Sequence, residues 1–254
     1  MGITIYYEYE MATENTDRII PILTGLGERA RQLGAKKVYE VMHFSQAEIK
    51  AIAKDIRDER QDYISRCSAT VEVAKTGITS VYVSVLPNEI YLLHVEPGDG
   101  CEPALFAFCS FPETIEFKGK RVPTGLDGRW NYGTFCKTEY AKRFAYCHKL
   151  VISLLDYLKK SGDLISLEVF DDTGYWDDRN EENLERFHQE SQEFLAALAG
   201  VLLDSGTEAV KAPILDNPKF EHLEMEGRAK NPKLTKAFED GVKVMKGIQK
   251  IIDE

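Results

Sequence analysis

The chain has 254 residues, of which 43% are hydrophobic and 29% charged, a composition typical of a folded globular protein. Its formal charge of −10 argues against a broad phosphate-binding surface, because lysine and arginine carry most of the affinity for nucleic acid. The N-terminus lacks a basic stretch followed by an apolar run, and no stretch approaches 18 apolar residues. We therefore expect a cytoplasmic protein that binds neither nucleic acid nor a membrane.

The first 63 residues predict the order strand, helix, strand, helix. Residues 3–9 alternate as a strand, and its first face carries Ile3, Ile5, Tyr7 and Tyr9. A helix follows and ends at Gly34, but Pro21 lies inside its apolar pattern, so the helix should begin later than Thr16. Residues 37–44 predict a second strand, which completes a β-α-β unit.

A capping box between Ser45 and Glu48 predicts the next helix, which should run to about residue 63. Its inward-facing positions are expected to be Ile49, Ile52 and Ile56. Alternating residues over 78–96 predict a hairpin, the apolar run over 104–111 predicts a strand, and Gly119 is expected at the centre of a further short hairpin.

The stretch from Trp130 onward repeats this order. We predict a strand at 131–136, a helix from about Glu139 to Lys160, a strand at 164–170, a polar turn over Asp171–Trp176 and long helices at 181–203 and 233–251. The predicted fold class is α+β, with helices on one side of a largely antiparallel sheet. Residues 3–63 and 130–203 could be duplicated halves of a ferredoxin-like sandwich. We expect one domain over 1–206 and a helical extension over 207–254.

The familiar catalytic motifs are absent from the sequence, including HExxH, GxSxG and CxxC. Gly128 and Gly133 have the first spacing of a phosphate-binding loop, but Thr134 stands where the lysine belongs. The five cysteines, odd in number and widely spaced, are expected to be reduced. A zinc site built from them and His148 would need two tight ligand pairs, which the sequence lacks, so we predict no metal site and assign no cofactor.

Three residues are candidates for catalysis. His148 lies one residue from the buried stripe of its helix, where it could act as a general base near neutral pH. Asp172 or Glu168 would orient it or hold a cation, and Lys137, near a helix start, would stabilise an anion. The alternatives are a core histidine satisfied by a hydrogen bond, an aspartate that only forms a turn and a solvated lysine.

Polar groups bracketed by aromatic residues predict a small-molecule pocket, which we place near the Cys101-Glu102 loop and the acidic turn. The residues expected to line it are Cys101, Glu102, Tyr140, Glu168, Asp171, Tyr175 and Trp176.

Several segments together resemble a family of uncharacterised bacterial proteins. The segments that carry the resemblance are the MGITIYYEY start, Gly100–Pro103 with the following FAFCSFP, Phe135–Ala141, the pair Cys147-His148 and Asp171–Trp176. The family has FCKTQYA-like and DEGGYW-like segments, whereas Glu139 replaces the glutamine here and Asp172-Thr173 replace Glu-Gly. The resemblance covers residues 1–204. It implies a soluble bacterial protein with a shared site, and no known reaction, cofactor or substrate.

The interpretation we favour is a ligand-binding or regulatory protein that could form a homodimer. One alternative is a hydrolase or transferase that uses His148. Another is an interaction module that docks through the C-terminal helix, by Phe238, Val242, Met245 and Ile248.

Overall fold

The structure, a computed structural model, describes residues 3–76, 78–206 and 212–253. Internal contacts divide the chain into two units. We call Thr4–Asp172 the sheet unit and the residues from Thr173 onward the helical unit. The domain boundary expected after residue 206 stays a prediction.

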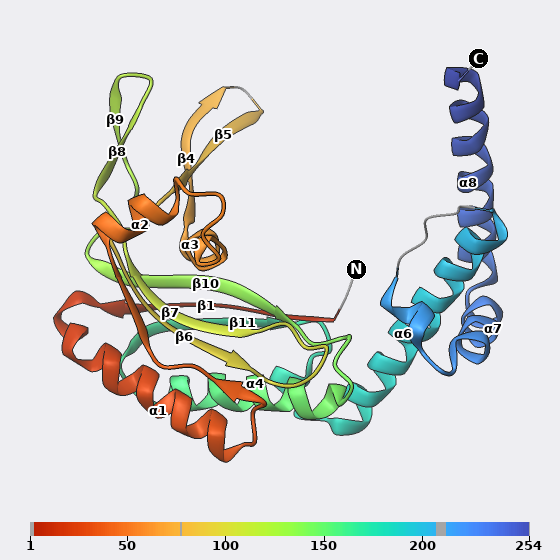
Figure 1. Cartoon of the computed structure of the whole chain (residues 1–254), viewed down its shortest axis with the longest axis horizontal. Helices are drawn as coiled ribbons and strands as arrows, with labels where there is room; N and C mark the ends of the chain where they lie inside the picture. Colours follow the sequence, from red (N-terminus) through yellow and green to blue (C-terminus); the bar gives the residue numbers. More distant parts are fainter. Residues whose placement is uncertain (1–2, 77, 207–211, 254) are drawn as a thin grey trace. The chain divides into compact units, whose positions relative to one another are not determined.

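The sheet unit is built on one seven-stranded sheet with the strand order β11-β1-β10-β7-β6-β2, and β3 also pairs with β6 (Figure 1). Its strands are β1 (Thr4–Ala12), β2 (Lys37–Val38), β3 (Met42–Ser45), β6 (Glu89–Glu96), β7 (Ala104–Ser110), β10 (Arg129–Lys137) and β11 (Leu164–Asp171). Every described pair of neighbouring strands is antiparallel. The predicted α+β class with a largely antiparallel sheet is therefore confirmed.

Two helices cover one face of this sheet, α1 (Ile19–Gln32) and α4 (Phe144–Lys160) (Figure 1). The alternation of β1 explains which face they cover, because Ile5, Tyr7 and Tyr9 are buried while Tyr6 and Glu8 on the other face are exposed. We call the face that α1 and α4 cover the helix face and the opposite one the open face.

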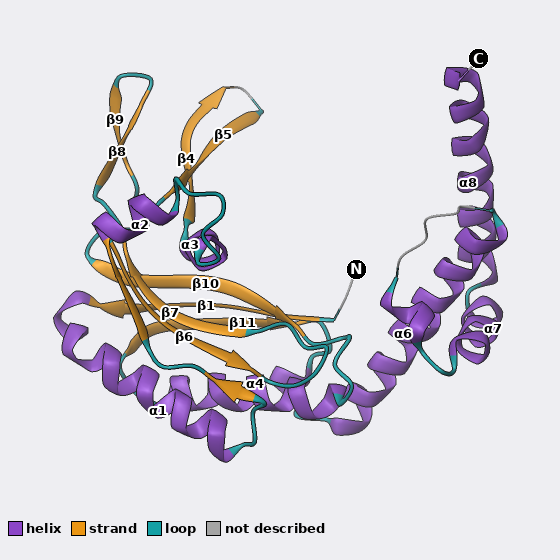
Figure 2. Ribbon diagram, viewed as in Figure 1, coloured by secondary structure: helices purple, strands orange, loops and turns teal. Residues whose placement is uncertain are grey.

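Smaller elements stand over part of the open face (Figure 2). They are α2 (Gln46–Ile52), α3 (Gln61–Cys67), the hairpin of β4 (Ala69–Thr76) with β5 (Thr79–Val85) and the hairpin of β8 (Thr114–Phe117) with β9 (Lys120–Pro123). They leave room between themselves and the sheet, and a cavity described below occupies part of that room.

The strands β10 and β7 pair over only two residues, where Trp130 and Asn131 face Ser110 and Cys109. Past this point the backbone of β7 bonds to tyrosine hydroxyls that reach across from β1. Their bonds are Tyr7 Oη to the Leu105 carbonyl at 2.7 Å, Tyr9 Oη to the Ala107 carbonyl at 2.8 Å and the Ala107 N–H to Tyr9 Oη at 3.0 Å. The tyrosines thus replace ladder hydrogen bonds, which buried backbone groups require.

Several local expectations are confirmed and others are wrong. The α1 helix begins at Ile19, so Pro21 lies in its first turn, where no intrahelical N–H bond is needed. The Ser45–Glu48 capping box is also present, at the start of α2. The helix after Ser45 ends at Ile52, and Ile56 is exposed instead of inward. The predicted hairpin over 78–96 is also wrong, because β5 pairs with β4 and β6 pairs with β7.

Two further expectations concern strand pairing and the start of α4. The strand predicted at 37–44 is split into β2 and β3, and neither pairs with β1, so the expected β-α-β unit has no adjacent strands. The α4 helix begins at Phe144, five residues after the predicted start.

The helical unit consists of α5 (Tyr175–Asp178), α6 (Glu181–Asp204), a 3₁₀ turn (Pro213–Asp216), α7 (Phe220–Lys230) and α8 (Pro232–Asp253). Within it, α6 packs against α7 and α8, and a small buried cluster forms around Ala196 and Leu223. None of the helices in the described ranges is long and apolar enough to cross a membrane.

Candidate functional site

The open face of β11, β1 and β10 presents its side chains in three cross-strand rows. Because directly opposed residues of an antiparallel pair point to the same side, the register defines each row. The rows are Phe170, Tyr6 and Phe135; then Glu168, Glu8 and Gly133; then Ser166, Glu10 and Asn131. An aromatic row therefore borders a row with two carboxylates.

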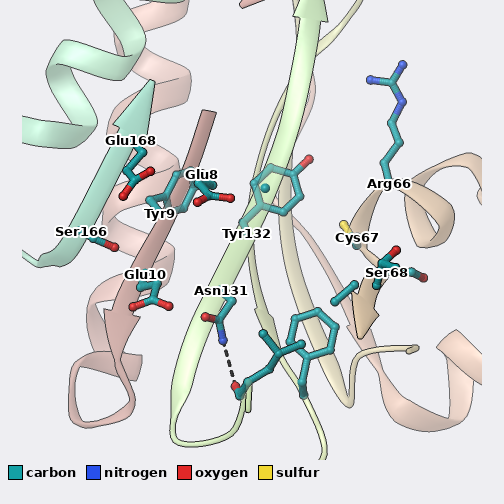
Figure 3. Close-up of a pocket in the computed structure, with 15 residues that line it drawn as sticks. Glu8, Tyr9, Glu10, Arg66, Cys67, Ser68, Asn131, Tyr132, Ser166 and Glu168 are labelled. Carbon is teal, nitrogen blue, oxygen red and sulfur yellow. Dashed lines mark hydrogen bonds between the residues drawn. The ribbon is translucent and has the colours of Figure 1, made fainter. Parts of the chain in front are cut away.

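A cavity of about 740 Å³ lies over the second and third rows. Its floor comes from β1, β10 and β11, and its opposite wall from the end of α3 and the start of β4 (Figure 3). Figure 3 shows Glu8 and Glu168 on adjacent strands, with Arg66, Cys67 and Ser68 across from them. This volume lies within the range of small-molecule pockets.

Two carboxylates of the floor are unpaired. Glu10 forms an ion pair with Arg129 at 2.6 Å, but within the described part of the chain neither Glu8 nor Glu168 forms a hydrogen bond or an ion pair. Gly133 completes their row without a side chain, so the space beside the Glu8 carboxylate stays open. Like charges directly opposed across two strands are unfavourable, so this pair costs stability in the absence of a cation.

Two polar atoms of the cavity residues, Tyr132 Oη and Arg66 Nη1, are buried and have no hydrogen-bond partner among the residues that the structure describes. Tyr132 is only 4% exposed, and its ring extends from β10 toward the α3 side of the cavity (Figure 3). Burial raises its pKa well above the ordinary value, so the hydroxyl stays protonated and can donate. Arg66 is held loosely, by Asp62 at 3.5 Å and Glu102 at 3.8 Å. An unsatisfied buried polar group costs about 1–3 kcal/mol, which a ligand that bonds to it would recover.

His148 lies on the helix face and is fully buried. Its Nε2 is 3.1 Å from Asp171 Oδ2, and its Nδ1 is 2.9 Å from Thr138 Oγ1. The predicted contact with a carboxylate is thus present, through Asp171 instead of Asp172 or Glu168. Because the His148 and Asp171 side chains both have no exposed surface, the geometry favours a satisfied core histidine over a general base.

Lys137 and Asp172 do not join His148. Lys137 points to the open face, because its Nζ lies 5.7 Å from the centre of the Phe135 ring on that face. His148 lies under the opposite face. The predicted catalytic trio is therefore split, because alternate residues of a strand point to opposite faces. The Asp172 side chain accepts a hydrogen bond from the Thr4 N–H at 2.9 Å and thereby extends the pairing of β11 with β1.

The Cys101-Glu102 loop and the start of the acidic turn lie at the same end of the sheet. The Glu102 N–H bonds to the Lys137 carbonyl at 3.0 Å, and Lys137 pairs with Thr4, whose carbonyl accepts from Asp172 at 3.2 Å. Two strands separate the two segments. Of the residues predicted to line a pocket, only Glu168 lines the 740 Å³ cavity.

The three predicted aromatic residues are not part of this cavity. Tyr140 is 39% exposed, and its carbonyl lies against Gly100. Tyr175 and Trp176 belong to α5 of the helical unit, where the Arg179 guanidinium lies 4.7 Å from the Trp176 ring centre. Their assignment to a ligand site stays a prediction.

Sequence reasoning missed Glu8, Arg66 and Tyr132. The alternation of residues 3–9 could have placed Glu8 opposite the buried face, but its position beside Glu168 depends on a strand pairing 160 residues apart in the chain. Across the described ranges, no cluster of three or more histidine, cysteine, aspartate or glutamate residues has an arrangement that could hold a metal ion.

Comparison of the chain with protein-family models, with curated proteins and with solved structures finds no match. The resemblance to uncharacterised bacterial proteins therefore stays a prediction.

Proposed function

We propose that the chain is a ligand-binding protein whose ligand is a small organic cation held in the 740 Å³ cavity. The observation that carries the proposal is a pair of carboxylates, Glu8 and Glu168, on the floor of one cavity, which form no hydrogen bond or ion pair within the described part of the chain. Two buried atoms of cavity residues, Tyr132 Oη and Arg66 Nη1, also have no hydrogen-bond partner among the described residues. In folded proteins, buried polar groups usually have hydrogen-bond partners within the protein, so groups that lack one point to a ligand that supplies it.

The charges suggest the chemical class of the ligand. An ammonium or guanidinium group between Glu8 and Glu168 would relieve their repulsion and form charge-assisted hydrogen bonds. Tyr132 Oη and Arg66 Nη1 each have less than 1 Å² of accessible surface, so a side-chain rotation must first bring them to the cavity. An oxygen acceptor elsewhere on the same molecule would then take hydrogen bonds from them. A small amine or guanidine that also bears a hydroxyl, carboxylate or amide fits this arrangement better than an anion does.

The test is a thermal-shift screen of the full chain with arginine and ethanolamine, which carry an oxygen acceptor, and with agmatine and spermidine, which lack one. Succinate is the anionic comparison. We expect at least one cation to raise Tm and succinate to leave Tm unchanged, because only a ligand that binds the folded state stabilises it. Glu8→Gln and Glu168→Gln should each abolish the shift. Glu113→Gln, at an exposed position outside the cavity, is the matched control and should keep it. A shift with succinate, or none with any cation, would contradict the proposal.

The two alternative functions stay predictions. A hydrolase or transferase that uses His148 would need access to a side chain that is fully buried. An interaction module would use α8, on which Phe238 and Met245 are exposed while Val242 is buried. The side chain of Ile248, the fourth residue of that prediction, lies outside the described residues.

A further inference from the structure

Three thiols meet at one end of the sheet unit. Cys101 lies in the loop before β7, Cys136 in β10 and Cys147 in the first turn of α4. The Cys101 side chain interacts electrostatically with both other thiols. Its Sγ lies 3.6 Å from the Lys137 carbonyl, and its N–H bonds at 3.2 Å to the carbonyl of Gly98, which packs against Cys147 Sγ. Because the three come from separate elements, only the tertiary fold brings them together.

The three thiols differ in their access to solvent. Cys101 is partly exposed, whereas Cys136 and Cys147 are buried. Cys147 nevertheless lines a second cavity, of about 410 Å³, together with Lys36, Lys142 and Arg143. A small oxidant can therefore reach Cys101 from solvent, next to a second thiol at the wall of a cavity.

The loop that carries Cys101 is held against the segment before α4. A Cβ atom at Gly98 would lie 2.7 Å from Cys147 Sγ, and one at Gly100 would lie 2.1 Å from the Tyr140 carbonyl oxygen. The Lys142 N–H also bonds to the Asp99 carbonyl at 2.9 Å. These contacts hold the loop that carries Cys101 against the segment that carries Cys147.

We propose that Cys101 and Cys147 form an oxidative modification site, in which a peroxide converts the two thiols into a disulfide. Because a neighbouring thiol and burial raise the pKa of Cys101, this thiol ionises at alkaline pH, and the reaction is expected to speed up there. The Cys101 thiolate then attacks one oxygen of hydrogen peroxide, the O–O bond breaks, and a sulfenic acid and hydroxide form. The Cys147 thiol then loses its proton and its sulfur attacks the Cys101 sulfur. The S–O bond breaks, the leaving hydroxide takes up the Cys147 proton to form water, and the disulfide closes. The two sulfurs lose two electrons in total, and the peroxide gains them.

Two other thiol contacts make the assignment specific. Cys136 also touches Cys101, but its Sγ donates to the Glu102 carbonyl at 3.3 Å and its strand is fixed by pairing with β1. Cys67 and Cys109 are in contact with each other as well, but they are 3% and 0% exposed. Access to the oxidant therefore selects Cys101, and the less constrained neighbour Cys147 completes the bond.

The experiment treats the reduced full-length protein with hydrogen peroxide, blocks the remaining thiols and maps the peptides by mass spectrometry. We expect a loss of two hydrogen atoms from the intact mass and a cross-linked peptide that joins Cys101 to Cys147. Cys101→Ser should abolish the cross-link. Cys147→Ser should leave a sulfenic acid at Cys101, detectable with a sulfenic-acid probe, so a folded variant still reports on the first step. Cys109→Ala is the control and should cross-link as the wild type does.

A disulfide to Cys136, a first cross-link between Cys67 and Cys109, or loss of the cross-link in Cys109→Ala would overturn the proposal. So would an unchanged Cys101 thiol after the same peroxide treatment above pH 9, where the thiolate forms. Since the readout is a mass and not a ligand response, this proposal and the proposed function can fail independently.

Discussion

The hydroxyl of Tyr9 should be worth much more to stability than that of its neighbour Tyr132. Both side chains are buried, and their ring centres lie 5.8 Å apart. The Tyr9 hydroxyl donates to the Ala107 carbonyl and accepts from the Ala107 N–H, whereas the Tyr132 hydroxyl has no partner in the described ranges of the chain. Tyr9→Phe therefore removes two hydrogen bonds and leaves two buried backbone groups unsatisfied. At about 1–3 kcal/mol for each group, and allowing for partial relaxation, we expect a loss of about 2–4 kcal/mol in the free energy of unfolding.

Tyr132→Phe is the matched comparison, because it removes the same atom from a site where that atom bonds to nothing. We expect a change within about 0.5 kcal/mol, or a small gain in stability. The assay is urea unfolding followed by circular dichroism, with the shift in midpoint compared at an unchanged m-value. Equal losses for the two variants would refute the view that tyrosine hydroxyls replace the ladder between β10 and β7.

Three further predictions concern single positions. Gly100→Ala should lower the free energy of unfolding by more than about 2 kcal/mol, since φ is +78° and the new Cβ would meet a backbone carbonyl. Gly125→Ala, where φ is +70° and the new Cβ would meet open space, should lower it by only about 1–2 kcal/mol. Equal losses in urea unfolding would be inconsistent with the close approach at Gly100. Hydrogen bonding to a neighbouring thiol and burial raise the pKa of Cys101, so its alkylation rate in the reduced protein should still be rising above pH 9, and a plateau below pH 8 would contradict this. Burial acts to raise the pKa of Glu193, but hydrogen bonds, chiefly from Lys230, outweigh it and lower the pKa. Stability should therefore fall as the pH drops below about 4, where this carboxylate becomes protonated. Lys230→Met should make this loss of stability smaller, and an unchanged loss in a pH series of melting curves would count against the pair.

Local patterns in the sequence predicted many elements of the fold. The alternation of residues 3–9 predicted β1 and its buried face, the capping box placed the start of α2, and the apolar stripe around Val151 predicted α4. Each of these signals lies within a few residues of the element that it predicts.

Strand partners were harder to predict because they depend on contacts across the chain. The hairpin expected over 78–96 had suitable turn residues, yet β6 instead lies between β7 and the short strands β2 and β3. The long helix expected after Ser45 failed at Ile56, where its apolar period continues but no core covers it. Periodicity indicates a face, and only tertiary packing decides whether that face is buried.

The candidate site illustrates the same limit. Glu168 was predicted from its acidic surroundings, but the cavity exists because β11 pairs with β1 and sets Glu168 beside Glu8. Arg66 and Tyr132 come from two further elements, and their unsatisfied atoms become visible only when every hydrogen bond of the fold is known. The contact of His148 with a carboxylate was predicted, whereas its complete burial was not.

Calorimetric titration tests the central claim most directly. The wild type and the double variant Glu8→Gln, Glu168→Gln are each titrated with the cation that gives the largest thermal shift. The account predicts one site per chain in the wild type and affinity at least about 10-fold weaker in the double variant, because the variant lacks two charge-assisted hydrogen bonds worth about 1.5–3 kcal/mol each. Equal affinity in the two proteins would show that the cation binds elsewhere and would contradict the account.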